Sequence, residues 1–365
     1  MNNSVTRREL IMIGTDPNAK GGIATIVTKY RQIGLFKKWR VNYLLTHVEG
    51  SINRKLTVAL NAYWCLFALL LDGHVGLLHI HVASRASTWR KSIFAVTAVL
   101  FRVPYVLHLH GAGFVEFFHN ECGPVKRMII RGFLKRAGSV IALSESWATQ
   151  LRQMEPEARV EVVYNSVSLP PEQMDYKHSE RKREILFLGQ IGERKGAFDL
   201  IRAFAAAGSD AELLLGGDGE INKAAELASQ LGVSEHVRLL GWVTGADKDA
   251  LLATASVFVL PSYNEGLPMS VLEAMAWRVP VITTPVGGIP EVVRQNKEGL
   301  IVPPGDIHRL SRALRKLLSD ASLRERLGDN GRARVQNVFS DTVVLPRLEA
   351  IWARFGLFPL YQTDC

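Results

Sequence analysis

Residues 261–275 concentrate the residue types that bind polar ligands. Two carboxylates, Glu265 and Glu273, stand eight positions apart in this segment. The preceding residues 257–260 are a short apolar run of β-favouring types, which predicts a buried parallel strand. Turn-forming residues then predict a loop, followed by a helix with Ser270 as its N-cap. Ligands bind at this edge of an open α/β sheet. We therefore predict a site for a polar, phosphorylated ligand.

A second group of residues combines glycines with adjacent cations. Arg194 and Lys195 stand between Gly192 and Gly196, after the first predicted strand of the second half. In a strand-to-helix turn, the backbone N–H groups and the two side chains would face an anion together. Arg can hold two phosphate oxygens at once, while Lys supplies a compact charge. The pattern favours an anion site, with a solvated loop as the alternative.

Two weaker patterns stand at predicted strand ends in the first half. Gly21 and Gly22 precede a predicted helix at residues 23–30, where glycines let the chain pass close to a ligand. A plain turn explains the diglycine equally well. His110 lies beside Gly111 at the ligand-binding edge, where its side chain could contact a sugar.

Alternation along a strand places His108 and His110 on the same side. A zinc site would need a third ligand, and the sequence offers none at a suitable spacing. The similar pair His79 and His81 is interpreted as structural. The Asp247-Lys248-Asp249 triplet matches a short metal-binding pattern, but its neighbours are typical of a helix start, where carboxylates are stabilising without a ligand.

These residues need elements to position them, and apolar strand-like runs alternate with helix-like segments along the whole chain. With 365 residues, 47% of them hydrophobic, the chain is long enough for two domains. The first-half strands are predicted at residues 10–13, 41–45, 77–81, 105–109, 139–143 and 160–164. The second-half strands are predicted at residues 184–188, 211–215, 237–240, 257–260, 279–283 and 299–302. Two doubly wound α/β domains with a cleft between them follow.

The predicted domain boundaries rest on composition. Residues 1–168 form the first domain, and the Pro-rich, charged segment 169–183 is the predicted linker. Residues 184–340 form the second domain. An Arg-rich helix is predicted around residues 310–327, and residues 341–365 contain a final amphipathic helix at about 343–355.

The net charge of +9 is unevenly spread. Residues 1–170 hold 21 Lys and Arg against 10 Asp and Glu, whereas residues 171–365 hold 23 against 25. A basic half indicates an acidic partner. The basic residues lack the aromatic interleaving that nucleic-acid binding uses, so anionic lipid is the better interpretation.

An apolar stretch at residues 56–71 bears on that interpretation. It is shorter than the roughly 20 residues that a membrane-spanning helix needs. A buried core helix and an interfacial helix flanked by Arg54 and Lys55 are both open. Three widely spaced cysteines fit a reducing compartment. Since the first nine residues are polar and unlike a signal peptide, we expect a cytoplasmic protein at the inner face of the membrane.

Taken together, the motifs resemble the retaining glycosyltransferases of family 4. The shared segments in the second half are residues 192–196, 216–219, 241–243, 265–273 and 284–291. In the first half the resemblance rests on Gly21-Gly22, His110-Gly111 and Asn165, which Ser166 follows where many relatives have Gly. The resemblance implies the GT-B fold, an α/β fold of two Rossmann-like domains. It also implies that the final helix crosses back to the first domain.

The resemblance also assigns roles to residues. Arg194 and Lys195 would neutralise the diphosphate leaving group in place of a metal ion, so that no metal or other cofactor is expected. Gly22 would make room for the diphosphate, and His110 would contact the donor sugar near its reacting carbon.

In the segment with the two carboxylates, Glu265 and the backbone of Gly266, Leu267 and Pro268 would hold the donor sugar and the diphosphate. Glu273 would contact the nucleotide ribose. The donor base should lie near Gly217, Trp242 and Val243, and GDP-mannose is the first expectation for the donor, followed by UDP-hexoses.

The implied reaction moves a hexose to an acceptor hydroxyl with retention at the anomeric carbon. Retaining hydrolases use a carboxylate nucleophile, whereas this family is usually assigned a front-side attack assisted by the leaving phosphate. Glu265 is therefore expected to position the sugar and stabilise charge. The basic first half suits a polyprenyl-diphosphate-linked oligosaccharide acceptor in bacterial exopolysaccharide or lipopolysaccharide synthesis.

Three other classes of function share parts of this pattern. A dinucleotide-dependent oxidoreductase would need a G-x-G-x-x-G turn, and the first predicted strand ends in Gly14-Thr15-Asp16 instead. A sugar-nucleotide epimerase would use the same fold without a second substrate. A non-catalytic, membrane-associated binding protein would not need the Arg194-Lys195 pair or the two glutamates.

Overall fold

Short apolar runs of this chain form parallel strands, and the segments between them form helices that cover the sheets. The computed structural model describes residues 8–171 and 181–360. By its internal contacts the chain divides into two units, Met1–Tyr164 with Pro346–Cys365, and Asn165–Leu345. Each unit contains one six-stranded sheet. The first unit ends four residues before the predicted boundary, and most of the predicted linker lies outside the described residues.

The sheet of the first unit has the strand order β2-β1-β3-β4-β5-β6, and neighbouring strands are parallel. Its strands are β1 (Glu9–Gly14), β2 (Val41–Leu45), β3 (Val75–Val82), β4 (Tyr105–Leu109), β5 (Ser139–Ala142) and β6 (Val160–Val162). Strands buried on both faces are nearly continuous apolar runs. All six predicted positions are confirmed, and the inner strands β3 and β4 are buried at every position.

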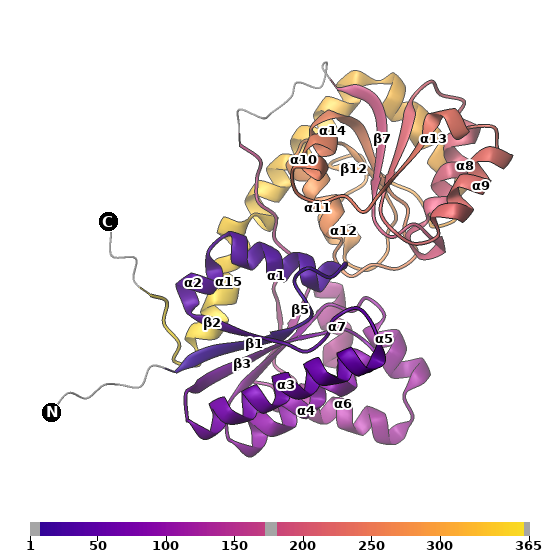
Figure 1. Cartoon of the computed structure of the whole chain (residues 1–365). Coiled ribbons are helices and arrows are strands. Elements are labelled where there is room, and N and C mark those ends of the chain that lie inside the picture. The colour runs from indigo at the N-terminus through magenta and orange to yellow at the C-terminus, as the bar shows by residue number, and fades with distance from the viewer. Residues whose placement is uncertain (1–7, 172–180, 361–365) are drawn as a thin grey trace. The chain divides into compact units, whose positions relative to one another are not determined.

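Helices cover both faces of this sheet. They are α1 (Gly22–Gln32), α2 (Leu35–Trp39), α3 (Ile52–Leu71), α4 (Ala86–Leu100), α5 (Phe114–Glu116), the π-helical turn η1 (Phe117–Glu121), α6 (Pro124–Arg136) and α7 (Glu145–Met154). Figure 1 shows α1 and α2 on one face and α3, α4 and α6 on the other. Leu107 and Leu109 of β4 face α4 and α6, with which they line a small cavity. The alternating His108 and His110 therefore point to the opposite face.

The buried-core interpretation of residues 56–71 is wrong. The helix α3 that contains them begins earlier, with Ser51 as its N-cap, and is 20 residues long. Its buried side chains are Ala62, Leu66 and Leu70, which form one stripe against the rest of the unit. Several of its large apolar side chains, among them Leu56, Leu60 and Trp64, are exposed. By length and composition this helix could cross a membrane. In the structure, however, its buried stripe packs against the rest of the first unit.

The sheet of the second unit has the order β12-β11-β10-β7-β8-β9, and its neighbouring strands are also parallel. Its strands are β7 (Lys182–Leu188), β8 (Glu212–Gly216), β9 (Val237–Gly241), β10 (Ala255–Leu260), β11 (Val281–Thr283) and β12 (Gly299–Ile301). All six lie at the predicted positions within two residues at each end. The strand order reverses between β7 and β10, which are neighbours in the sheet although two strands separate them in the sequence.

The connections of this unit are helical. They are the 3-10 turn η4 (Glu193–Lys195), α8 (Ala197–Ala207), α9 (Ile221–Gln230), η5 (Ser234–His236), α10 (Gly245–Thr254), α11 (Met269–Ala276), α12 (Ile289–Val292), α13 (Ile307–Ser319), α14 (Ala321–Arg334) and the π-helical turn η6 (Val335–Phe339). The single Arg-rich helix predicted at residues 310–327 is wrong. Asp320 ends α13 and begins α14, because its Oδ1 accepts a hydrogen bond from the backbone N–H of Leu323 at 2.9 Å.

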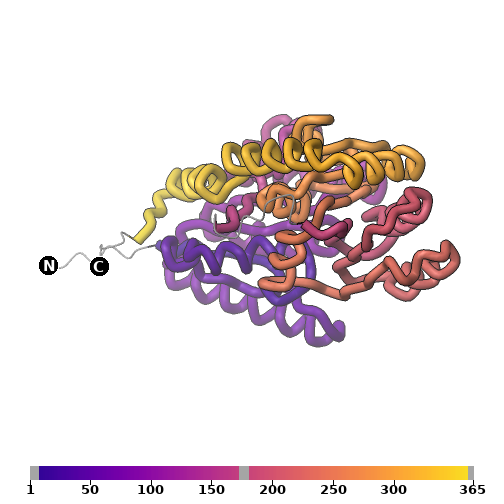
Figure 2. The backbone as a smooth tube through the Cα atoms, turned by 90° about the horizontal axis from the view of Figure 1, so that it is seen from above, coloured from indigo at the N-terminus to yellow at the C-terminus, as the bar shows by residue number. Residues whose placement is uncertain are grey.

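The last helix, α15 (Asp341–Ala353), returns the chain to the first unit from Pro346 onward. It is the yellow helix at the end of the colour scale (Figure 2). The carboxylate of Glu349 accepts hydrogen bonds from Lys38 Nζ at 2.7 Å and from Trp39 Nε1 at 3.1 Å. The ring of Trp352 packs edge-on against Trp39, so this helix completes the core of the first unit.

Candidate active site

The two most informative loops leave the second sheet side by side. One loop follows β7 and carries Arg194 and Lys195, and the other follows β10 and carries Glu265. Because β7 and β10 are neighbours in a parallel sheet, both loops emerge at the same edge. This is where the strand order reverses, the position at which open α/β sheets bind ligands.

An ion pair joins the two loops. Lys195 Nζ donates a hydrogen bond to Glu265 Oε1 at 2.5 Å, and Ser262 Oγ donates to the same oxygen at 2.7 Å. The exposed fraction is 16% for the Lys195 side chain and 6% for that of Glu265. The carboxylate is therefore fixed in position by a cation and a hydroxyl.

Close backbone packing keeps these loops in register. Gly196 has φ 70°, and a Cβ at this position would lie 2.2 Å from the carbonyl oxygen of Pro261. The backbone N–H of Tyr263 donates to the carbonyl of Arg194 at 2.9 Å. Glycine is required at position 196 because any other residue would be strained at this positive φ, and because its Cβ would push the two loops apart.

The loop after β11 holds Glu265 from the other side. Gly287 has φ 56°, and its Cβ would lie 1.8 Å from the carbonyl oxygen of Glu265. The neighbouring Gly288 donates its N–H to the carbonyl of Gly266 at 2.7 Å. Gly287 and Gly288 thus let the loop after β11 pack directly on the backbone of Glu265 and Gly266. This contact fixes the position of Glu265.

The backbone after Glu265 runs directly into α11. Asn165 Nδ2 donates to the carbonyl of Leu267 at 2.8 Å, which explains why this buried amide lies near the site. The prediction that Ser270 caps the helix is wrong, because α11 begins at Met269 and Pro268 is its N-cap. Proline has no side-chain acceptor. The first N–H groups of α11 therefore have no side-chain cap, and helix N-termini of this kind can bind anions.

Glu273 has a partner that the sequence did not indicate. Lys248 Nζ donates to Glu273 Oε1 at 2.7 Å, and both side chains are partly exposed. Lys248 belongs to α10, where Asp247 lies in the first helical turn, as the helix-start interpretation of this triplet predicts. The two residues are 25 positions apart on different helices, so no local pattern could have paired them.

The remaining predicted donor residues differ in how firmly they are held. Arg194 is exposed, and its closest side-chain partner is Gln190 Oε1 at 3.5 Å, a long contact that leaves the guanidinium available. A Cβ at Gly217 would lie 1.8 Å from the carbonyl oxygen of Gly189, so this glycine joins the loops after β7 and β8. Trp242 is 42% exposed at the end of β9.

Val243 is half-buried and lies near the end of β8. A Cβ at Gly216 would come within 3.2 Å of its side chain. These two residues and Gly217 therefore bring the loops after β8 and β9 together at the predicted base-binding edge.

In the first unit, the diglycine after β1 opens a helix. Gly21 has φ 132° and is the N-cap of α1, and Gly22 is its first residue. A Cβ at Gly22 would meet no atom of the described residues within 4 Å. Packing in the described chain therefore does not require glycine at position 22, in contrast to Gly196 and Gly287.

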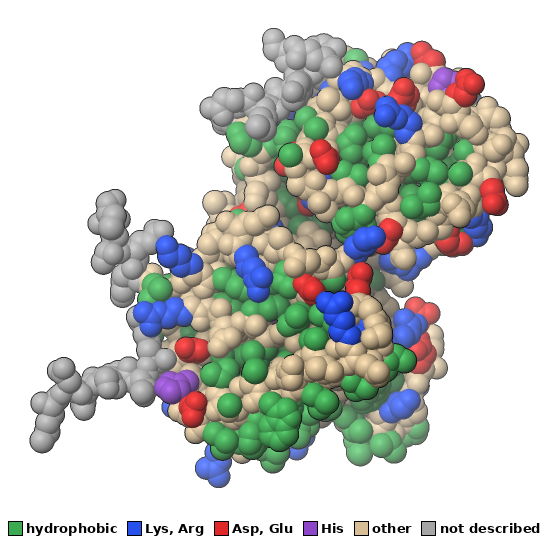
Figure 3. Space-filling view, viewed as in Figure 1, with side chains coloured by type: hydrophobic (Ala, Val, Ile, Leu, Met, Phe, Trp, Pro, Cys, Tyr) green, Lys and Arg blue, Asp and Glu red, His purple; other side chains and the backbone are tan. Residues whose placement is uncertain are grey.

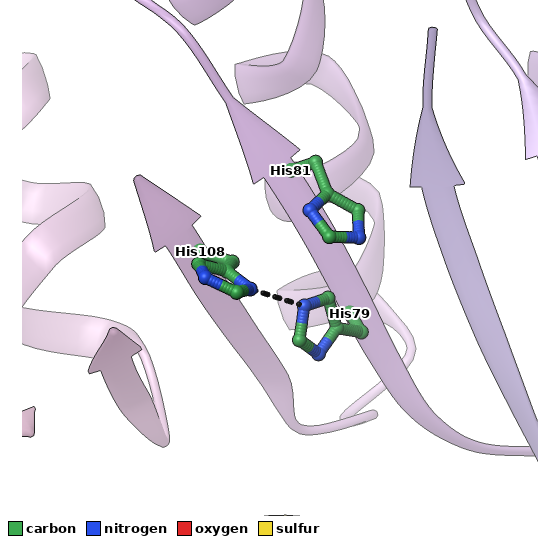
Figure 4. Close-up of side chains that lie close together, drawn as sticks. All are labelled: His79, His81 and His108. Carbon is green, nitrogen blue, oxygen red and sulfur yellow. Dashed lines mark hydrogen bonds between the residues drawn. The ribbon is translucent and has the colours of Figure 1, made fainter. Parts of the chain in front are cut away.

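The two histidine pairs form one cluster, because β3 and β4 are neighbours with His81 opposite His108. His81 Nδ1 lies 2.8 Å from His110 Nε2, and His79 Nε2 lies 3.2 Å from His108 Nδ1. Figure 4 shows three of these rings on the same side of the two strands. The sequence missed this arrangement, although its two H-x-H pairs on consecutive strands are a signal for it.

The ligand atoms of His79, His81 and His108 lie within 4.8 Å of one another. The pairing of β3 with β4 therefore brings together three histidines, although the sequence spacing did not indicate a third ligand. Both ring nitrogens of His79 are already engaged, however, since Trp352 Nε1 donates to its Nδ1 at 3.0 Å. A metal ion would have to displace one of these hydrogen bonds, so the cluster is described best as a hydrogen-bonded array.

The array is uncharged at neutral pH. Burial lowers the pKa of His79 and of His110 to about 3, and it lowers the pKa of His81 and His108 well below the usual range. The bond from Trp352 leaves Nδ1 of His79 without a proton, so His79 donates through Nε2 to His108. His110 is half-buried at the edge and is oriented by His81. It can offer a neutral ring to a polar ligand.

Comparison with known proteins places the chain in a family. The sequence model described as Glycosyltransferase Family 4 matches residues 24–169, and the one described as Glycosyl transferases group 1 matches residues 171–334. The chain belongs to the family 4 glycosyltransferases. One relative is the capsular polysaccharide biosynthesis glycosyltransferase CapM of Staphylococcus aureus, 30% identical over 236 residues. The match covers 60% of this chain and 62% of CapM, slightly less than two thirds of its length.

Two solved structures share the architecture. Sucrose-phosphate synthase from Thermosynechococcus elongatus superposes with a TM-score of 0.79 at 22% identity, over 96% of this chain and 99% of that one. HepE of Anabaena, in complex with UDP-glucose, gives 0.74 at 18% identity, over 95% and 99%. The predicted two-domain GT-B fold is confirmed by these neighbours and by the two parallel sheets.

Proposed function

We propose that this family 4 glycosyltransferase moves a hexose from a nucleotide sugar to a hydroxyl of a lipid-linked oligosaccharide, with retention at the anomeric carbon. The observation that carries the proposal is the Lys195–Glu265 pair, which is fixed where the strand order of the second sheet reverses. A cation and a carboxylate at that edge suit the diphosphate and the sugar hydroxyls of one ligand.

The cations of the loop after β7 neutralise the leaving group. As the bond between the sugar and the diphosphate breaks, negative charge grows on the diphosphate oxygens. Lys195 is positioned by Glu265 before any ligand arrives, and the exposed Arg194 is available to hold two oxygens. With these two cations and the N-terminus of α11, the proposal needs no metal ion.

Glu265 positions the donor sugar and does not attack it. Its Oε1 already accepts hydrogen bonds from Lys195 and Ser262, which withdraw the electron density that a nucleophile would use. A retaining transfer then proceeds with the acceptor hydroxyl entering on the face that the diphosphate leaves. The leaving phosphate takes the hydroxyl proton. The neutral ring of His110 is assigned to a sugar hydroxyl near the reacting carbon.

GDP-mannose is the first donor that we propose, and a UDP-hexose is the second. The UDP-hexose is supported by the complex of HepE with UDP-glucose. The base would lie along the loops after β8 and β9, where Trp242 offers an exposed ring for stacking. Glu273, held by Lys248, would accept a hydrogen bond from the ribose.

The acceptor proposal rests on charge and on relatives. Residues 1–170 carry 21 Lys and Arg against 10 Asp and Glu, which suits a diphosphate-linked lipid at an anionic membrane. CapM is described as a capsular polysaccharide biosynthesis glycosyltransferase. We accordingly propose cell-surface polysaccharide synthesis at the inner face of the membrane.

Nucleotide binding and transfer are tested separately. A thermal-shift screen of the full chain against GDP, UDP and ADP should show one nucleotide that raises the melting temperature most. The matching nucleotide sugars are then incubated with a prenyl-diphosphate-linked acceptor, and the anomeric configuration of the product is read by NMR. An inverted product would refute retention. Conversion of the donor without an acceptor would indicate an epimerase instead, and nucleotide binding without turnover would indicate a binding protein.

The site assignment has its own test. Lys195→Ala and Glu265→Ala are each expected to reduce transfer nearly to background, because each removes one half of the pair that faces the donor. Near-normal turnover in both variants would refute the assignment while leaving the family and the fold untouched.

A further inference from the structure

The helix α3 has an exposed apolar stripe in addition to its buried one. Ala62, Leu66 and Leu70 face inward, as a helix packed on a sheet requires. Four large apolar residues at a spacing of four form the outward stripe, with exposed fractions of 76% for Ile52, 55% for Leu56, 56% for Leu60 and 63% for Trp64. Helices that are apolar all round are normally buried on every side. The outer side of α3 is not.

Two neighbouring helices extend this surface. On α4 the residues Ile93, Val96 and Leu100 are exposed by 55%, 48% and 75%, and their spacing places them on one side of that helix. On α6, Val125 and Met128 are exposed by 65% and 67%. Figure 3 shows hydrophobic side chains gathered along this edge of the first unit, over α3 and the helices beside it.

The three helices that carry this surface are already packed against one another and against the sheet on their inner sides. Tyr63 of α3 packs edge-on against Phe94 of α4, with ring centres 6.1 Å apart, and Phe67 packs in the same way against Phe101, at 5.6 Å. The inner sides of α4 and α6 line one small cavity with Leu107 of the sheet. The exposed stripes are thus outside a core that is already complete. Contiguous apolar surfaces of this kind mark interaction sites.

The charges on these three helices are of one sign. The helices hold nine Lys and Arg in 48 residues, two on α3, two on α4 and five on α6, and the same segments contain no Asp or Glu. Arg54 and Lys55 stand at the start of α3, and Lys126 and Arg127 at the start of α6. A second copy of this chain would bring basic helices against basic helices, which disfavours self-association through this surface.

We propose that the outer side of α3, α4 and α6 is a membrane-binding surface that dips into the headgroup region of an anionic lipid bilayer. The apolar stripes would enter the acyl boundary, with Trp64 at the depth that its amphipathic ring prefers. The basic residues at the helix starts would meet the anionic headgroups. The proposal goes beyond the lipid-linked acceptor because it assigns the membrane contact to named helices, and it is tested without donor or acceptor.

Flotation of the full chain with vesicles tests both parts of the surface. Vesicles of phosphatidylcholine with about one third phosphatidylglycerol should bind the chain more tightly than phosphatidylcholine alone. The double variant Leu60→Gln, Trp64→Gln should weaken binding to the anionic vesicles at least ~10-fold, since each buried apolar side chain contributes about one tenfold step or more. The matched control Leu231→Gln, Phe358→Gln also replaces an exposed leucine and an exposed aromatic residue, and its binding should be unchanged.

The electrostatic part has a separate variant. Replacing Arg54 and Lys55 by glutamine should weaken binding to anionic vesicles about 10-fold and leave the weak binding to neutral vesicles unchanged. Melting temperatures of the variants within a few degrees of the parent would show that they fold. Equal binding of the Leu60→Gln, Trp64→Gln variant and the parent, or failure of the parent to float, would refute the proposal.

The depth of α3 can be read at Cys65, which is exposed on this helix. A polarity-sensitive fluorophore at Cys65, in a chain with Cys365→Ser, should shift its emission to the blue when anionic vesicles are added. The same label on Leu231→Cys in a chain that also carries Cys65→Ser should not shift. If the parent chain is a dimer in solution and the double variant Leu60→Gln, Trp64→Gln is a monomer, the surface is a protein interface and the proposal is overturned. Either result is independent of transfer activity.

Discussion

The two units have the same kind of sheet, but the candidate site of the second unit contains charged side chains and that of the first contains neutral ones. In the second unit the site residues are charged and paired, as Lys195 with Glu265 and Lys248 with Glu273. In the first unit the polar side chains on β3 and β4 are histidines held in their neutral form. The charged residues stand on loops and helices, whereas most of the histidines lie within strands.

The difference follows from where each group meets water. A charge at the edge of the second sheet has a partner of opposite sign, which offsets the hydration that it loses. A charge on the buried face of a strand would lose its hydration, and burial therefore keeps the imidazoles unprotonated. Under the proposed function, the second unit would neutralise a charged ligand, and the first would offer hydrogen bonds without adding charge.

The largest expected effect concerns charge in the second unit. Lys195→Ala should lower kcat by about 10³-fold, because one preorganised cation at a developing charge is typically worth ~10²–10³ in rate and this one also orients Glu265. The measurement is initial-rate transfer with saturating donor. Lys182→Ala, at the opposite end of β7, is the control and should keep the parent rate. A loss of less than tenfold in Lys195→Ala would mean that charge is not what the second unit contributes.

The next effect compares a glycine from each unit. Gly287→Ala should cost at least about 3 kcal/mol of unfolding free energy, because its Cβ would overlap the carbonyl of Glu265 at a positive φ. Gly22→Ala should change that free energy by less than about 1 kcal/mol, since its Cβ would enter space free of the described residues. Urea unfolding measures both.

The same pair separates structure from binding. Gly22→Ala should still reduce affinity for the nucleotide sugar if the space before it takes the diphosphate, as titration calorimetry would show. Equal stability losses in the two variants would remove the distinction between a glycine that joins loops and one that leaves room for a ligand.

The third effect is a pH dependence that belongs to the first unit. Burial lowers the pKa of His79 to about 3, from about 6.5 when the group is exposed. Below pH 6.5 the unfolded chain therefore binds a proton at this histidine that the folded chain does not bind. The contribution of this group to the free energy of unfolding is complete above pH 6.5 and decreases as the pH falls. Each such histidine should contribute a loss of about 1.4 kcal/mol per pH unit.

The window between pH 6.5 and 4.5 isolates this contribution. The paired carboxylates Glu155 and Glu298, whose pKa values are lowered, begin to matter only below it. Urea unfolding across the window should give a smaller slope for His79→Gln, with the exposed His74→Gln as control. A slope equal to that of the parent would show that the array is not held neutral.

The smallest effect concerns the outer ion pair. Lys248→Ala should change stability by less than about 1 kcal/mol, because both partners are partly exposed to water. It should raise KM for the donor a few-fold with kcat nearly unchanged, since a ribose contact acts equally in the ground state and the transition state. A fall in kcat instead would give Lys248 a direct part in the transition state.

Local sequence was sufficient for the elements that are locally defined. All twelve strands of the described residues lie where they were predicted. The inner strands β3, β4 and β10 are buried at every position, and such strands are short, nearly continuous apolar runs. The loops that carry Lys195 and Glu265 followed from those strands. Helix ends were less reliable. Pro268 and not Ser270 is the cap of α11, and Asp320 divides a helix that composition alone predicted as one.

Partners that are distant in sequence were decided by the tertiary structure. Lys195 and Glu265 are 70 positions apart, and they meet because β7 and β10 are neighbours in the sheet. The histidine array needs β3 beside β4 and the return of Trp352 on the last helix. Strand order depends on how all the helices pack, which no local pattern contains.

The sequence by itself thus determined the strands, the family resemblance and the residue types at the edge of the second sheet. Only the tertiary structure decided which of those residues touch, which glycines are required by close backbones, and that one side of α3 is left exposed. The physical reason is that apolar periodicity shows that a side chain avoids water, whereas burial also depends on what the rest of the chain places against it.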